Sequence, residues 1–236
     1  MNWLRQLFGR GPVLQPAQVQ LLERYQALPR NPANTLLDDL RFVVADVETT
    51  GLNPVADRLI SIGAITVVSG KIHLDSAFEV ILRQTSASPD ANILIHGIDG
   101  TTQLSGKEPA DALLEYLEYI GQSPLVGYHS GFDKVMIDRA AKAAIGDMPF
   151  NDWLDLARLA PALFPDREGG KDHALDIWLE KFGITNHARH NALADALATA
   201  QLLQVVIARA MAGGAETLGD LIRIEQEQRW LDHLNR

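Results

Sequence analysis

The chain has 236 residues, of which 47% are hydrophobic, with a formal net charge of -9 and no cysteine. Its length and composition indicate a folded globular protein of one large domain or two small ones, and they exclude a mainly disordered chain. Without cysteine, disulfides and thiolate metal sites are excluded, so carboxylates, imidazole and water would have to hold any metal. The charge argues against a basic, histone-like nucleic-acid binder, but it is compatible with an enzyme that meets phosphates through bound cations.

Turn-prone sequence surrounds one helical stretch near residues 19–27 in the first 39 residues, which we interpret as an N-terminal extension. Trp3, Leu4, Leu7 and Phe8 would form a small apolar patch there. Packing of this patch on the main domain is the first interpretation, and binding to a partner or a membrane surface is the alternative. We find no secretory signal and no apolar run approaching the roughly 20 residues that cross a bilayer, which predicts a cytoplasmic protein.

The remaining sequence predicts strands followed mostly by helices. Apolar patterning predicts an antiparallel meander of three strands, 41–47, 59–68 and 72–82, and a buried strand in 123–128. Helical segments are predicted at 108–120, 132–145, 154–163, 174–182, 192–212 and 216–234, and a short strand would precede Asp155. We see no internal repeat. A mixed sheet with helices on its faces is a three-layer α/β architecture.

Two acids interrupt the end of an apolar strand in "FVVADVETTG", residues 42–51. Alternate side chains of a strand point to opposite faces, so Asp46 and Glu48 share a face while Val47 turns to the core. Two like charges at a buried sheet end repel each other unless they are solvated, share a proton or hold a cation. A divalent metal is therefore one interpretation, and an ordinary solvated strand end is the alternative.

Two further acids lie near predicted helix starts. Asp133 falls in the first turn of a helix that Ser130 or Gly131 would cap, where an acid is also a common helix stabiliser. Asp155 follows an apolar stretch, and we interpret it first as a helix cap and second as a supporting partner of a site.

A histidine and a fourth acid stand in "HARHNALADALATAQLL". His190 and Asp195 would lie on different faces of a continuous helix, so their spacing favours His190 on the preceding loop and Asp195 on the helix. His187 competes for the same role, and a lone histidine is usually a surface or core group.

Together, "DVETTG", "LIHGID", "HSGFDKVMID" and "HNALADA" stand in an order that resembles the DEDDh branch of the DEDD 3'-to-5' exonucleases, in particular its DNA polymerase III epsilon-like group. The resemblance covers roughly residues 40–210. It implies a ribonuclease-H-like three-layer α/β fold whose central mixed five-stranded sheet is flanked by helices. Residues 1–39 would then be the extension, 40–212 the exonuclease domain and 213–236 a C-terminal helical segment.

The resemblance also assigns roles to individual residues. It implies that the metal-binding carboxylates are Asp46, Glu48, Asp133 and Asp195, that the catalytic histidine is His190, and that the terminal nucleotide meets Thr49, Thr50, Leu52 and His96. Four departures argue against identifying this chain with the replicative subunit. Ser130 and Gly131 replace a common Asn-Ala pair, and Ser61 stands where that group often has Glu. The N-terminal extension of about 40 residues is a third departure, and the C-terminal segment, which does not resemble the polymerase-binding tail, is a fourth.

The chemistry of phosphodiester hydrolysis agrees with this set of four carboxylates and one histidine. Two Mg²⁺ or Mn²⁺ ions would be held with Asp46 bridging, and His190 would take a proton from water near neutral pH. We expect a 3'-to-5' exonuclease acting on single-stranded or frayed nucleic acid, with DNA favoured, and releasing nucleoside 5'-monophosphates. The alternatives are an RNA-trimming exoribonuclease of the same fold and a nuclease-like binding module. A protein partner would dock through residues 1–39 or 213–236.

Overall fold

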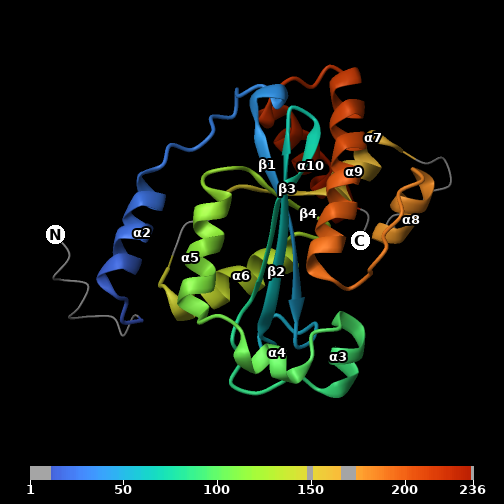
Figure 1. Ribbon diagram of the computed structural model, residues 1–236. Helices are drawn as coiled ribbons and strands as arrows, with labels where there is room; N and C mark the ends of the chain where they lie inside the picture. Colours follow the sequence, from blue (N-terminus) through green and yellow to red (C-terminus); the bar gives the residue numbers. More distant parts are fainter. Residues whose placement is uncertain (1–11, 148–150, 166–173, 235–236) are drawn as a thin grey trace.

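Apolar residues on both faces of two long strands place them at the centre of a buried sheet. In the computed structural model, which describes residues 12–147, 151–165 and 174–234, β1 (Arg41–Thr49) and β2 (Leu59–Val68) pair antiparallel (Figure 1). Strand β3 (Lys71–Ile81) pairs antiparallel with β2, while β4 (Leu125–Gly127) and β5 (Trp153–Asp155) add in parallel, giving the order β3-β2-β1-β4-β5. The predicted mixed five-stranded sheet is confirmed.

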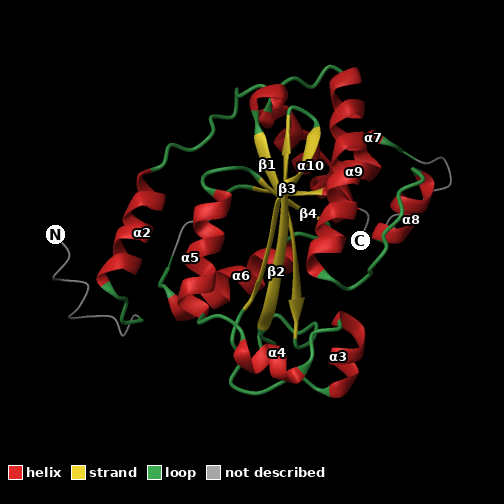
Figure 2. Ribbon diagram, viewed as in Figure 1, coloured by secondary structure: helices red, strands yellow, loops and turns green. Residues whose placement is uncertain are grey.

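Helices cover both faces of this sheet (Figure 2). Helices α2 (Pro16–Ala27), α5 (Pro109–Ile120) and α6 (Gly131–Ala144) lie on one side. The other side holds α7 (Leu156–Leu163), α8 (Leu175–Lys181), α9 (Ala192–Ala212) and α10 (Leu218–Leu234).

Strand alternation decides which layer each residue of β1 meets. Val43 and Ala45 pack in the core beneath α5 and α6, whereas Val44 packs in the core that includes α9. Because side chains alternate, Asp46 and Glu48 lie on the α9 side of the sheet. The sheet thus directs both acids toward the start of α9.

Two short helices between β3 and α5 were not expected from the sequence. They are α3 (Asp90–His96) and α4 (Gly100–Ser105), which lie beyond one end of the sheet (Figure 1), and Asp99 caps α4 by accepting a bond from the Thr102 N–H (3.0 Å). Each is too short to show a clear helical period. The helix predicted over 154–163 begins later, at Leu156, because the preceding residues extend the sheet as β5.

Both flanking segments pack on the central domain. Leu22 and Tyr25 of α2 are buried, and the Tyr25 hydroxyl donates to the Asn151 Oδ1 atom (2.6 Å). A 3₁₀ helix, Leu37–Asp39, follows, and the Leu37 N–H donates to the Glu216 carbonyl (2.9 Å), which ties the two flanks together. Domain boundaries at residues 39 and 212 stay a prediction. The N-terminal patch of Trp3, Leu4, Leu7 and Phe8 lies outside the described residues.

Helix α9, with 21 residues, is long and apolar enough to cross a membrane, so the sequence does contain one segment of that length. However, 56% of its apolar window is buried inside the protein, where it packs against β1 and β2. These contacts are those of a core helix, and such a helix is weak grounds for a membrane span.

Candidate active site

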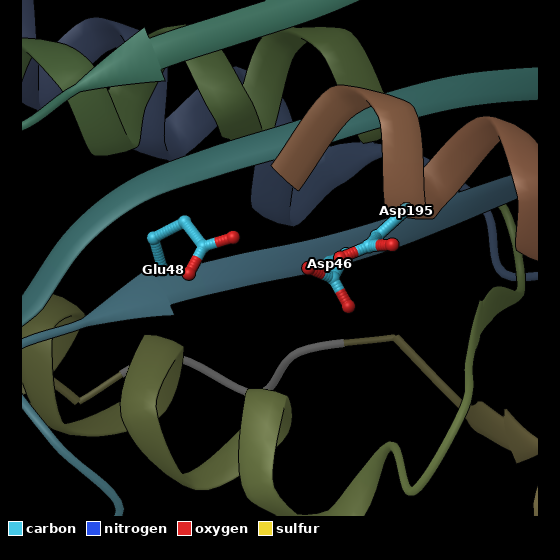
Figure 3. Close-up of side chains that lie close together, drawn as sticks. All are labelled: Asp46, Glu48 and Asp195. Carbon is cyan, nitrogen blue, oxygen red and sulfur yellow. The ribbon is translucent and has the colours of Figure 1, made fainter. Parts of the chain in front are cut away.

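Three carboxylates converge between the end of β1 and the start of α9. Figure 3 shows Asp46 and Glu48 on the strand and Asp195 on the helix, and one oxygen from each lies within 4.8 Å of the others. The Asn191 side chain caps α9 by accepting a bond from the Ala194 N–H (3.0 Å), so the helix begins where Asp195 falls in its first turn. Strand alternation and helix capping together gather the three acids.

A glycine in β2 permits this close approach of helix and strand. Gly63 pairs with Asp46 across the sheet, and a Cβ atom at Gly63 would lie 2.2 Å from the Leu193 nitrogen and 2.3 Å from the Ala192 carbonyl carbon. The first turn of α9 therefore rests directly on the backbone of β2. Gly63 was not predicted as part of the site, although a glycine inside an apolar strand is a known sign of a close backbone approach.

Asp133 approaches the cluster from the other side of the sheet's end. It lies buried in the first turn of α6, while Ser130 stands at the cap position without a capping side-chain bond. Burial raises the pKa of Asp133 to about 7, and the negative charge of Asp155 adds to the effect. Among the described residues, the group of three close carboxylates does not include Asp133, but the negative charge of Asp133 raises the pKa values of Asp46 and Glu48.

Burial and mutual repulsion make these carboxylates weak acids. Burial raises the pKa of Asp46 well above its ordinary range, and the neighbouring carboxylates add to the rise. Burial, followed by the charges of Asp195 and Asp133, raises the pKa of Glu48 to about 8. The positive charge of Arg189 opposes both shifts. Such a cluster ionises fully only when further positive charge compensates it.

The loop before α9 holds Asp195 with three donors. The Asn186 amide and the Arg189 Nη1 atom (2.7 Å) donate to Oδ1, and the backbone N–H of His190 donates to Oδ2 (2.9 Å). His190 lies on this loop, as expected, with φ 63° and an exposed side chain. His187 is also exposed. The backbone of His190 is therefore tied to the cluster, while its side chain faces solvent.

Asp155 performs the expected capping and also supports a neighbouring turn. Its Oδ1 atom accepts bonds from the N–H groups of Ala157 (3.0 Å) and His129 (2.9 Å). The first bond starts α7, and the second holds the turn at His129, where φ is 58°, just before α6. Asp155 thereby helps to fix the helix that carries Asp133.

The predicted nucleotide contacts near β1 lie directly beside Glu48. The Thr49 hydroxyl donates to the Gly51 carbonyl (2.6 Å), and the Thr50 hydroxyl donates to the Asp57 Oδ1 atom (2.9 Å). Leu52 follows on the loop and is 87% exposed. The two threonines thus shape the loop that presents Leu52 to solvent.

His96, a predicted nucleotide contact, is buried near the end of α3. It is 5% exposed, and its Nδ1 atom accepts a bond from the Ile98 N–H (3.0 Å). Its Nε2 atom lies 3.4 Å from the Ser88 hydroxyl, and burial lowers the pKa of its ring. In this arrangement His96 ends α3, and its contact with a nucleotide stays a prediction.

The exonuclease family profile matches residues 43–203, which include the whole acidic cluster. The chain belongs to the exonuclease family. A DNA polymerase III subunit epsilon-like protein of Rhodobacter capsulatus is 31% identical over 193 residues, covering 80% of this chain and 27% of that protein. A PolC-type DNA polymerase III of Bacillus subtilis is 32% identical over 174 residues, covering 73% of this chain and 12% of that protein. The chain thus spans a minor part of these relatives.

Solved structures agree on the fold of this exonuclease domain. Exonuclease I of E. coli in complex with a dT13 oligonucleotide has a TM-score of 0.63 at 19% identity, covering 74% of this chain and 42% of that one. Its zinc-bound form in complex with single-stranded DNA has a TM-score of 0.62 at 21% identity, covering 72% and 41%. The predicted ribonuclease-H-like exonuclease fold is confirmed.

Proposed function

We propose that this chain is a 3'-to-5' exonuclease that removes nucleoside 5'-monophosphates from single-stranded or frayed DNA with the help of divalent cations. One observation carries the proposal: oxygens of Asp46, Glu48 and Asp195 lie within 4.8 Å of one another in a domain of the exonuclease family. The preference for DNA is supported by the oligonucleotide bound to Exonuclease I and by the names of the polymerase relatives.

The donor set fits hard divalent cations. Carboxylate oxygens suit Mg²⁺ and Mn²⁺, and the raised pKa values of Asp46 and Glu48 mark a site that lacks positive charge for full ionisation. Two such ions would be held by Asp46, Glu48, Asp133 and Asp195. When bound, such ions acidify water and stabilise the charge on a departing 3' oxygen.

The other residues of the site would handle the proton and the nucleotide. His190 would accept the proton of the attacking water, since an imidazole nitrogen can act as a general base. Its loop is tied to Asp195 through the backbone, so a shift of this loop would carry the imidazole over the cluster. Leu52 would offer its exposed side chain to the terminal base.

The test follows product ladders from 5'-labelled single-stranded DNA and RNA of matched sequence, with Mn²⁺ or with EDTA. We expect wild type to shorten DNA from the 3' end only with Mn²⁺, and Asp46→Asn to abolish this activity by removing a ligand of the cations. His190→Ala should retain Mn²⁺ and DNA binding but lose about two to four orders of magnitude in rate. Asp138→Asn, which alters an acid of α6 that pairs with Lys134, is the matched control and should stay active.

Three outcomes would contradict parts of this proposal. Faster shortening of RNA would replace it with an exoribonuclease. Equal activity of wild type and Asp46→Asn would mean that the cluster is not the active site. Binding of DNA without cleavage under any metal would point to a nuclease-like binding module.

Two wider proposals accompany the function. We propose a protein partner that docks through residues 1–39 or 213–236, which the DNA polymerase III names of the relatives support. Within α10, Trp230 and Leu234 are more than 60% exposed and would offer apolar surface to it. We also propose that the protein acts in the cytoplasm.

A further inference from the structure

Arg189 lies between two carboxylates that differ sharply in their surroundings. Its Nη1 atom is 2.7 Å from the Asp195 Oδ1 atom, whose side chain is 6% exposed within the acidic cluster. Its Nε atom is 2.8 Å from the Asp176 Oδ1 atom on α8, whose side chain is 59% exposed. One guanidinium therefore joins the cluster to a surface acid on a different helix.

The bond from Arg189 occupies one of the two oxygens through which Asp195 could bind a cation. A carboxylate oxygen offers roughly two lone-pair sites, and the Asp195 Oδ1 atom already accepts from Arg189 and Asn186. A cation bound through Oδ1 would have to displace one of these donors. Arg189 would leave first, because its positive charge is repelled by a divalent cation while the neutral amide of Asn186 is not.

Arg189 also supplies the positive charge that the cluster otherwise lacks. Its Nη1 atom lies 2.7 Å from the Asp195 Oδ1 atom, and one oxygen of Asp195 lies within 4.8 Å of oxygens of Asp46 and Glu48, so the charge of Arg189 acts on the whole cluster. A guanidinium remains protonated at any working pH, so this compensation does not depend on proton uptake. Arg189 and a divalent cation therefore serve the same carboxylates in the same electrostatic role.

Building on the proposed function, we propose that Arg189 is a positioning residue that competes with divalent cations for Asp195. Asp176 keeps Arg189 beside the site when a cation displaces it from Asp195. When cations are bound, Arg189 would leave Asp195 and remain paired with Asp176 alone. This change would loosen residues 186–190. His190, the residue after Arg189, has φ 63° in this segment, which lies in the left-handed region that is costly for residues other than glycine. Cation binding and release of the His190 loop would thus be linked through Arg189.

The experiment measures Mn²⁺ binding by calorimetry on the full chain after EDTA treatment, without nucleic acid. Arg189→Gln should bind Mn²⁺ about fivefold or more tightly than wild type, because the competing charge is gone. Asp176→Asn should bind it more weakly, because Arg189 then has only Asp195 as its ionic partner. The double variant should match Arg189→Gln, since Asp176 acts only through Arg189.

A control separates this competition from a general change in charge. Arg223→Gln removes a positive charge from an ion pair with Asp220 on α10 and should leave Mn²⁺ affinity unchanged. Asp176 is a surface residue, so its variant keeps the test informative even if Arg189→Gln folds poorly.

The changes in Mn²⁺ affinity of Arg189→Gln and Asp176→Asn have opposite signs if Arg189 competes with the cation, and not if Arg189 only orients Asp195. Weaker Mn²⁺ binding by Arg189→Gln would mean that Arg189 merely orients Asp195. Unchanged Mn²⁺ binding by Asp176→Asn would mean that Asp176 does not hold Arg189 when a cation is bound. Either result overturns the inference while the proposed function stands. A wild-type protein that binds no Mn²⁺ would overturn both. A preserved rank order of affinities, with Arg189→Gln tightest and Asp176→Asn weakest, would support the linkage.

Discussion

Acids of the same type behave differently in this protein because their surroundings differ. Hydrogen bonds from Thr102 lower the pKa of the exposed Asp99, which caps a helix. Burial and neighbouring charges instead raise the pKa of Glu48 to about 8 and that of Asp133 to about 7. Capping acids stabilise the fold when they are charged, whereas the cluster acids destabilise it when they are charged without a cation.

The raised pKa of Glu48 predicts a pH-dependent stability. The folded protein holds the Glu48 proton more tightly than the unfolded chain does, so this residue stabilises the fold below about pH 4.5 and loses its contribution as the pH rises toward 8. We expect the melting temperature of EDTA-treated wild type to fall across this range by roughly 5 °C or more relative to Glu48→Gln, measured by scanning fluorimetry.

Saturating Mn²⁺ provides the control for this pH effect. At about 100 times its dissociation constant, Mn²⁺ would add ~2.7 kcal/mol of stability and remove most of the fall in wild type. If the melting temperatures of wild type and Glu48→Gln in EDTA changed in parallel with pH, Glu48 would not have the raised pKa that this prediction uses.

At the scale of elements, the site depends on how closely α9 approaches β2. Asp195 comes from the helix and Asp46 from the neighbouring strand, so the spacing between the two elements sets the distance between two ligands. The backbone at Gly63 is the contact point, and any side chain there would meet the first turn of α9. The lack of a Cβ atom at Gly63 therefore helps to set the geometry of the cluster.

We expect Gly63→Ala to move the start of α9 and separate Asp195 from Asp46. A displacement on the order of 1 Å would lower the rate of DNA cleavage by about 100-fold. Gly131→Ala is the matched control, because a Cβ atom there would meet no heavy atom within 4 Å in the described part of the chain. Mn²⁺ calorimetry and cleavage assays on both variants would check this, and normal activity of Gly63→Ala would show that α9 can shift without cost.

Across the whole molecule, the C-terminal helix is part of the fold that supports the site. Leu218 and Leu221 of α10 are buried in the core shared with α7 and α9. Arg158 of α7 bonds Asp232 of α10 (2.9 Å), and its Nε atom lies 3.6 Å from Asp155, which braces the turn before α6. Contacts from the C-terminal segment therefore extend to the residues that position Asp133.

Removal of residues 214–236 should weaken the protein. Loss of two buried leucines costs about 3–6 kcal/mol, which corresponds to a fall in melting temperature of roughly 6–24 °C. Trp230→Ala, which changes an exposed residue of the same helix, should shift the melting temperature far less. An unchanged melting temperature of the truncated chain would show that α10 is dispensable for the fold.

The main elements and the order of the acidic motifs could be predicted from the sequence because their signals are local. Alternation along a strand puts Asp46 and Glu48 on one face, and an apolar helical period predicts the helices that carry Asp133 and Asp195, the second of which is capped by Asn191. The short α3 and α4 could not be predicted, since their few residues show no clear period.

Local sequence by itself determined that an apolar strand carries Asp46 and that helices carry Asp133 and Asp195, because dihedral preferences and periodicity act over a few neighbours. The strand ends two residues later than predicted, at Thr49, and the helix with Asp133 begins one residue earlier, at Gly131. Only the tertiary structure decided that Gly63 carries the start of α9, that His96 is buried, and that Arg189 joins Asp195 to Asp176. These features arise from how separate elements pack together, and neither strand alternation nor helical periodicity specifies contacts between elements.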